Sequence, residues 1–142
     1  MAKSLSKWMR RLLVNDLTLL GVAVPASFMI GMAVRLGRFE AIHPFLYNKR
    51  EMAHIAPREV KMVRRAVSRA VRFGPSKTCL TQASLGKILM NLLGGEATLH
   101  VGVRVGESHE VRAHAWLSVQ GITIVGGPES KVAPFRQIAQ FR

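Results

Sequence analysis

The sequence has one cysteine, Cys79, in 142 residues, and aromatic residues make up only 6%. One cysteine excludes a disulfide within the chain, which fits a reducing compartment. No zinc-finger or RRM-type motif accompanies the few aromatics, so sequence-specific nucleic-acid binding is not expected. No small-x-small cleavage site follows a short apolar core, so no cleavable signal peptide is expected either. No cofactor is indicated.

Positive charge and apolar residues are abundant. There are 21 Lys and Arg residues against 8 Asp and Glu, which gives a formal net charge of +13, and 49% of the residues are hydrophobic. A chain of this length and hydrophobicity forms a real core and fits one compact unit. The charge allows an acidic protein, nucleic acid or anionic lipid as partner, but it does not choose among them.

The region 1–56 is basic and then apolar. Residues 17–34 carry no charge over 18 residues, which is the lower edge for a membrane span. Pro25 interrupts this run, and arginines lie on both sides of it, so no positive-inside asymmetry results. We therefore expect one or two buried helices meeting near Pro25, and a segment on or in a membrane is the alternative.

Residues 39–57 contain several helix breakers and are expected to form a connector. A helix is predicted from Pro57 to Phe73, followed by Gly74 as its stop. Its apolar stripe leaves a basic face that is either ordinary solvated surface or a docking face for an acidic partner or peptide. The basic residues of this face are Arg58, Lys61, Arg64, Arg65, Arg69 and Arg72.

Cys79 falls in the first turn of the next predicted helix. Ser76 and Thr78 are both good N-caps, and Gly94 ends the helical run. A thiol there lies near unpaired backbone N–H groups and the positive end of the helix dipole. That setting favours the thiolate form and a nucleophile. The alternative is that Cys79 is a small buried apolar residue.

The spacing of apolar residues then changes from helical to alternating. It predicts strands at 97–105, 111–119 and 122–125 that form an antiparallel meander, and the tail after residue 128 is expected to dock on the sheet, partly as helix. The fold class is therefore α+β. It combines N-terminal helices, a helix with the cysteine at its N-terminus and an antiparallel sheet of at least three strands.

His114 lies in the middle of the second predicted strand, on the face that alternates with the aliphatic residues. A helix-terminal thiol with a histidine on a neighbouring strand is the arrangement of papain-like and transglutaminase-like enzymes. If Val105 pairs with Val111, His100 faces Trp116 and competes for the role of base. A zinc site formed by Cys79, His100 and His114 lacks any short-spaced ligand pair, so no metal is expected.

Three segments carry a resemblance to a known family: 79–85 (CLTQASL), 97–104 (ATLHVGVR) and 113–121 (AHAWLSVQG). They resemble the transglutaminase-like leader peptidases of lasso-peptide biosynthesis, the microcin-processing B protein family, over about residues 58–142. The resemblance implies a division into an N-terminal helical region at 1–56 and a transglutaminase-like protease domain at 57–142. It also implies the freestanding type, in which a separate protein recognises the leader.

The same resemblance implies that Cys79 attacks the amide that joins leader and core peptide, while His114 activates it. The family usually supplies an aspartate after the histidine, and here the only aspartate is Asp16. With Val119 paired to Ile122, His114 would fall opposite Gly127. A backbone carbonyl, Gln120, Ser118 or Glu129 remains to orient the ring, although Gln120 lies poorly for it, or a Cys–His dyad suffices. Gln82 and Trp116 are candidates to line the site, and ordinary helix surface is the alternative for Gln82.

The implied partners are the lasso precursor peptide, the leader-recognition protein and the ATP-dependent lasso cyclase. We expect a cytoplasmic protein, with association to a membrane surface left open. Two other functions remain: a catalytically silent adaptor of the same fold, motivated by the missing aspartate, and a basic membrane- or nucleic-acid-binding protein.

Overall fold

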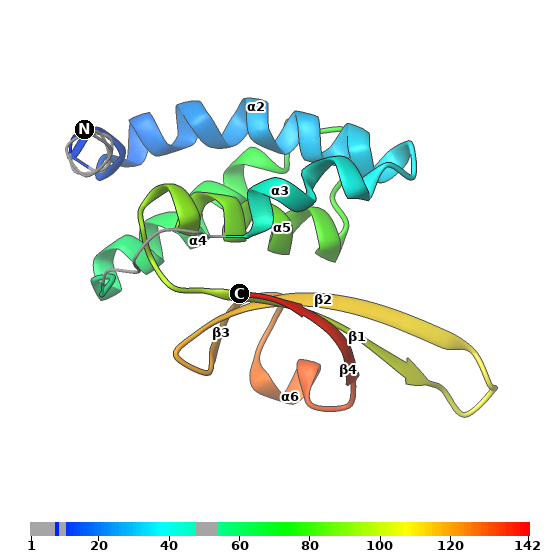
Figure 1. The fold of residues 1–142 in the computed structure, drawn as a ribbon. Coiled ribbons are helices and arrows are strands. Elements are labelled where there is room, and N and C mark those ends of the chain that lie inside the picture. The colour runs from blue at the N-terminus through cyan, green and yellow to red at the C-terminus, as the bar shows by residue number, and fades with distance from the viewer. Residues whose placement is uncertain (1–7, 9–10, 48–53) are drawn as a thin grey trace.

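A computed structural model gives the chain a layer of helices over one face of an antiparallel sheet (Figure 1). It describes residue 8 and residues 11–47 and 54–142, with the backbone alone for Glu129 and Ser130. The α+β prediction is confirmed. In chain order the elements are α2 (Asp16–Arg35), η1 (Phe39–Ile42), α3 (His43–Leu46), α4 (Pro57–Ala70), α5 (Cys79–Leu92), β1 (Thr98–Val105), β2 (Val111–Val119), β3 (Ile122–Val125), α6 (Glu129–Val132) and β4 (Arg136–Phe141).

The apolar run near the N-terminus forms one helix, α2, which is one of the two arrangements expected from the sequence, and no second helix begins near Pro25. Asn15 caps it by accepting a hydrogen bond from the Leu17 N–H (3.1 Å), and the helix continues through Pro25. A proline leaves the carbonyl four residues earlier without its donor. That carbonyl belongs to Gly21, which is exposed, so water can bond to it. Packing of α2 against α4 and α5 stabilises the continuous helix.

Helix α4 begins at Pro57 as predicted but ends at Ala70, three residues before the predicted end. The Glu59 carboxylate accepts a hydrogen bond from the Ala56 N–H (3.3 Å), which satisfies a donor at the helix start. The connector before α4 contains η1 and α3, two short helices that the sequence did not indicate.

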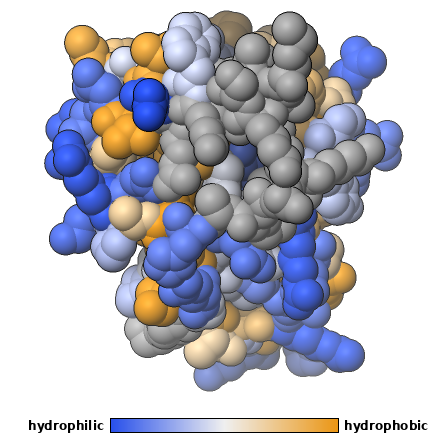
Figure 2. Space-filling view, turned by 60° about the vertical axis from the view of Figure 1, so that its left-hand side comes forward, coloured by the Kyte–Doolittle hydropathy of each residue, from blue (hydrophilic) through white to orange (hydrophobic). Residues whose placement is uncertain are grey.

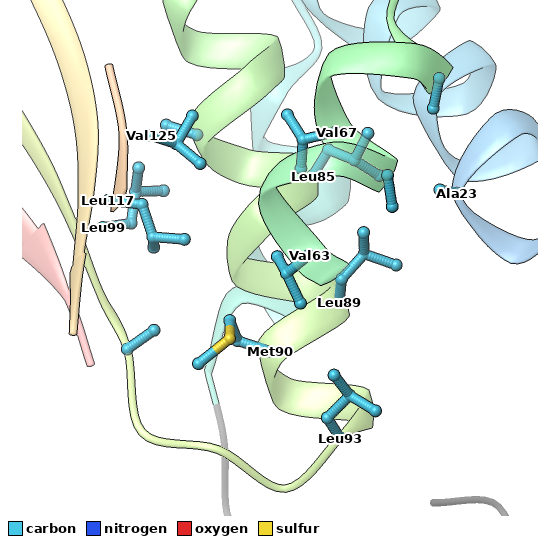
Figure 3. Close-up of a cluster of buried hydrophobic side chains, with 14 of the residues drawn as sticks. Ala23, Val63, Val67, Leu85, Leu89, Met90, Leu93, Leu99, Leu117 and Val125 are labelled. Atoms are coloured by element: carbon cyan, nitrogen blue, oxygen red, sulfur yellow. The ribbon is translucent and has the colours of Figure 1, made fainter. Parts of the chain in front are cut away.

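Helix α5 lies at the centre of the core, between the other helices and the sheet. Figure 3 shows Leu85 and Leu89 of α5 in one cluster with Val63 of α4 and Leu117 of β2. Gly86 permits this close contact, because a Cβ there would lie 2.9 Å from Leu117 Cδ2. One core joins the N-terminal helices to the sheet, and the division at residues 56 and 57 stays a prediction.

The sheet has four strands in the order β3-β2-β1-β4. The predicted register of β1 with β2 is confirmed: Val105 pairs with Val111, and His100 pairs with Trp116. The tail supplies the short helix α6 and the fourth strand, β4, antiparallel to β1. A bulge between Leu117 and Ser118 shifts the pairing of β2 with β3.

The two faces of the sheet have different surroundings. The fully buried Leu99 and Leu117 point toward the helices, and Val125 joins them (Figure 3). His100, His114 and the buried Trp116 alternate with these residues and lie on the opposite face, the side on which Figure 1 shows α6. The helix that carries Cys79 and the ring of His114 therefore lie on opposite sides of β2.

Candidate active site

Cys79 is the first residue of α5, as the sequence predicts. Of the two candidate caps, Thr78 takes the role: its Oγ1 accepts a hydrogen bond from the Thr81 N–H at 3.3 Å. The next amide, Gln82 N–H, donates to the Thr78 carbonyl. In the described part of the chain, the N–H groups of Cys79 and Leu80 have no partner, so both can donate to an anion beside the thiol.

Three hydroxyl groups fix the turn before the cysteine. Thr81 Oγ1 donates to Ser76 Oγ at 3.0 Å and lies 3.0 Å from Thr78 Oγ1. Ser76 and Thr81 are buried. Gln82, predicted to line the site, donates from Nε2 to the Lys77 carbonyl at 3.0 Å. It thus braces the same turn. These bonds hold the first turn of α5 in one conformation.

The Cys79 thiol is half-buried, and it packs against the edge of the core. Within the described residues it makes no hydrogen bond. It is therefore neither a deeply buried apolar residue nor, in this conformation, one member of an ion pair. Its environment combines the N-terminus of a helix with partial access to solvent.

The imidazole of His114 has a defined orientation on the other face of β2. Its Nε2 lies 2.8 Å from the Gly126 carbonyl oxygen, so Nε2 carries the hydrogen and donates it. The ring stacks on Trp116 at 6.1 Å between centroids and lies 5.2 Å from Phe135. In the neutral ring, Nδ1 is then the unprotonated nitrogen and the one that can act as a base.

His100 is the weaker of the two candidate bases. Its Nδ1 lies 2.5 Å from Gln137 Oε1 and donates to it, so Nε2 accepts from the Ser118 hydroxyl at 2.7 Å. The ring also stacks on Trp116 at 5.2 Å. Since both nitrogens already have partners within the fold, His100 has no free basic nitrogen.

The group that orients His114 is a backbone carbonyl, one of the alternatives left open by the sequence. The expected register placed Gly127 opposite His114, but the regular pairing of β2 with β3 ends at Leu117, and the ring bonds to the Gly126 carbonyl. Ser118 bonds to His100 instead. Gln120 is an exposed residue of the turn after β2, and the side chain of Glu129 lies outside the described residues.

The structure does not bring Cys79 and His114 together. The described contacts of the imidazole are with Gly126, Trp116 and Phe135, all on the face of the sheet away from α5. The pairing of β2 with β3 ends at Leu117, so the edge of β2 beside His114 has no strand partner among the described residues. Trp116 stacks on the rings of both His100 and His114 and thus lines the histidine cluster.

Lys87 is a buried ionisable residue that the sequence analysis did not single out. It is fully buried, and its Nζ donates to the Ala97 carbonyl at 2.6 Å. Burial lowers the pKa of Lys87 from 10.5 to about 8, and the charge of Glu96 opposes that shift. The sequence did contain an indication that Lys87 is buried. It is the single charged residue of α5, and a helix with so little charge is typically buried on all sides.

A basic hollow lies on the outer face of α4. Its volume is about 470 Å³, and the described residues that line it are Lys61, Arg64, Arg65 and Ser68. Arg65 also lies 3.6 Å from Asp16 at the start of α2. In Figure 2, hydrophilic side chains cover most of the described surface that comes forward, with smaller hydrophobic patches between them. The hollow therefore suits an acidic group better than an apolar one.

No three His, Cys, Asp or Glu side chains of the described residues converge in a way that could hold a metal ion. The remaining histidines have other surroundings. His43 contacts the rings of Phe39 and Phe141, while His54 and His109 are exposed. None of these three belongs to the cluster around Trp116.

Comparison with known proteins gives one match. Residues 24–140 match the sequence model of a family described as Transglutaminase-like superfamily. No curated protein and no solved structure matches the chain. The matched range begins within α2 and includes Cys79, both strand histidines and the whole sheet, so it covers most of the chain.

Proposed function

Because the chain belongs to the transglutaminase-like superfamily, we propose that it is a cysteine peptidase that removes the leader from a lasso-peptide precursor. The observation that carries this proposal is the position of Cys79, half-buried at the first residue of α5 beside two unpaired N–H groups. The superfamily includes cysteine proteases. The specific substrate rests on the resemblance of residues 79–85, 97–104 and 113–121.

In the proposed reaction, the Cys79 thiolate attacks the carbonyl carbon of the amide between leader and core. The N–H groups of Cys79 and Leu80 stabilise the oxyanion. The C–N bond breaks as His114 gives a proton to the leaving amine, and a thioester of the leader remains on Cys79. Water then attacks the thioester while His114 takes up its proton, which releases the leader acid and the free thiol.

The Gly126 carbonyl would serve the role that the family gives to an aspartate. It accepts the Nε2 hydrogen of His114 and leaves Nδ1 as the base. A carbonyl carries no full charge, so it stabilises the imidazolium less than a carboxylate does. We therefore expect a working but slower base than a Cys–His–Asp arrangement provides.

This reaction requires a movement of the His114 side chain. The ring lies on the face of β2 opposite α5, so it must swing around the unpaired edge of the strand to reach the thiol. Binding of the leader by the partner protein supplies a reason for the movement, because a ligand shifts the population toward the conformation it prefers. A freestanding peptidase would then cleave only when its leader-recognition protein is present.

The basic hollow of α4 offers a docking place for that partner. Its lining of Lys61, Arg64 and Arg65 attracts acidic side chains and raises the rate of association. We place the reaction in the cytoplasm, where the thiol stays reduced, and next to the ATP-dependent cyclase that consumes the released core peptide.

A mass measurement on a mixed reaction tests the proposal. Precursor peptide is incubated with the leader-recognition protein, with and without this chain. The expected result is two fragments whose masses sum to the precursor plus one water, formed only when both proteins are present. Intact precursor under all conditions, with a folded chain, would count against the peptidase.

A catalytically silent adaptor is the second candidate. The observation that favours it is that no hydrogen bond in the described structure joins Cys79 to His114, whose ring lies on the face of β2 away from α5. An adaptor would bind the same partners and leave the precursor whole, and Cys79 would react with alkylating reagents no faster than a free cysteine.

A further inference from the structure

The outward face of α2 is an apolar stripe in the described structure. The exposed apolar residues of this stripe follow one another at intervals of three or four positions, with Phe28 and Met29 adjacent: Leu17, Gly21, Pro25, Phe28, Met29, Met32 and Leu36. They therefore form one side of the helix, opposite the buried Leu19, Ala23 and Ile30. Leu17 is 77% exposed, Met29 is 69% exposed and Phe28 is 54% exposed.

Such a face is unusual for a helix on the surface of a protein in water. An outward helix face normally carries charged and polar residues, and contiguous exposed apolar patches mark interaction sites. Here no charged residue lies between Leu17 and Val34. The catalytic proposal does not use this stripe, so it needs an occupant of its own.

Positive charge lies at both ends of the apolar stripe. Arg11 precedes it and Arg35 and Arg38 follow it, and all three are exposed. At the N-terminal end of the stripe, Arg65 of α4 forms an ion pair with Asp16 of α2. This contact brings the basic face of α4 beside the start of α2. The nearby acidic groups are fewer: Asp16 is offset by Arg65, and Glu40 lies in η1. The stripe is thus an apolar ridge between cationic ends.

We propose that the outward face of α2 lies in the surface of an anionic lipid bilayer. The apolar side chains enter the boundary between head groups and acyl chains, and the arginines at the two ends contact anionic head groups. The stripe runs along a helix of 20 residues, about 30 Å long, which can lie along a lipid surface. Its shape and flanking charge favour lipid over a protein groove.

The helix lies along the bilayer and does not span it. Over Asp16–Arg35 it is long and apolar enough to cross a membrane, with a mean hydropathy of 2.0. Its inner face, however, packs in the core against α4 and α5. Spanning would remove that face from its contacts and expose the core, whereas lying in the surface keeps both faces covered.

Sedimentation with lipid vesicles tests the proposal on the full chain. Vesicles of phosphatidylcholine with about three parts in ten phosphatidylserine are compared with vesicles of phosphatidylcholine alone. We expect binding to the anionic vesicles, weaker binding to the neutral ones, and a loss of at least about tenfold in the variant Leu17→Gln/Phe28→Gln/Met29→Gln. The matched control Val105→Gln/Val111→Gln/Ile138→Gln, which changes exposed apolar residues of the sheet, should bind like the wild type.

Absent binding by the wild type, or equal binding by the α2 variant, overturns the proposal. A dimer in sedimentation velocity that the α2 variant loses, without vesicle binding, would assign the stripe to a second copy and also overturn it. Circular dichroism checks that each variant folds. A second readout does not depend on the triple variant: the emission of Phe28→Trp should shift to the blue with anionic vesicles, and that of Ile138→Trp should not.

Discussion

The Nε2 atom of His114 lies 2.8 Å from the carbonyl oxygen of Gly126. This contact orients the imidazole without a carboxylate and leaves Nδ1 as the basic nitrogen. It also ties the ring to the loop after β3, on the face of the sheet away from α5. The proposed chemistry therefore depends on a backbone oxygen for orientation and on a side-chain movement for contact with Cys79.

Replacement of the base should stop cleavage. His114→Ala is expected to lower the rate of precursor cleavage by about 10² to 10⁴, because His100, the other histidine of the Trp116 cluster, has both ring nitrogens bonded within the fold. His100→Gln is the matched control, and it should keep the rate within about tenfold, since His100 bonds within the fold. Loss of activity in His100→Gln together with full activity in His114→Ala would show that His100, and not His114, is the base.

A side chain at position 126 should displace the orienting carbonyl. Gly126 has a φ of 112°, and a Cβ there would lie 2.6 Å from Trp116 Cβ. Gly126→Ala is expected to lower the free energy of unfolding by about 1–3 kcal/mol and to slow cleavage as well.

The neighbouring glycine provides the control for that variant. Gly127 has a similar φ of 103°, but its added Cβ would meet the flexible Lys131 side chain. Gly127→Ala should cost stability through strain and leave the cleavage rate of the folded protein unchanged. Urea unfolding and initial rates measure the two effects, and equal rates in the two variants would argue against the role of the Gly126 carbonyl.

The cap of α5 should stabilise the cysteine turn. Thr78→Ala removes the acceptor of the Thr81 N–H and is expected to lower the free energy of unfolding by about 1 kcal/mol. Thr78→Ser keeps the hydroxyl and should remain close to the wild type. Urea denaturation compares the three proteins. Equal stability of Thr78→Ala and the wild type would show that the hydroxyl cluster does not hold this turn.

Buried Lys87 predicts a dependence of stability on alkaline pH. Its pKa is about 8 in the folded chain and 10.5 in the unfolded chain, so the unfolded state binds more protons between these values. The free energy of unfolding should therefore rise from pH 8 to pH 10.5, by about 3 kcal/mol. Lys87→Met should lack this rise. The difference between the two proteins in urea unfolding at several pH values measures it, and parallel curves would contradict it.

Much of the fold follows from short-range patterns in the sequence. Alternation along residues 111–119 predicted β2 within its observed bounds, and Gln120-Gly121 predicted the turn that pairs Val119 with Ile122. Thr78 was one of two predicted caps for the helix that carries Cys79. These features depend on residues close together in the chain, so local chemistry suffices to predict them.

The errors arose where tertiary packing decides. Contacts with α4 and α5 keep α2 continuous through Pro25, where the sequence left one or two helices open. The irregular pairing of β2 with β3 ends at Leu117, so the register expected beside His114 does not form and the ring bonds to the Gly126 carbonyl. The same alternation that predicted β2 also placed His114 opposite the aliphatic residues. Because the helices cover the aliphatic side, that pattern indicates a face away from α5, which the expected Cys79–His114 contact did not take into account.

The most direct test of the account is the rate of precursor cleavage by the variant Cys79→Ala. The leader-recognition protein is present in each reaction, and fragments are measured by mass. Ser84→Ala, a change of similar size in the same helix, is the control. The account predicts no detectable cleavage by Cys79→Ala, near wild-type cleavage by Ser84→Ala, and unchanged folding of both by circular dichroism. Cleavage by Cys79→Ala at the wild-type rate would contradict it.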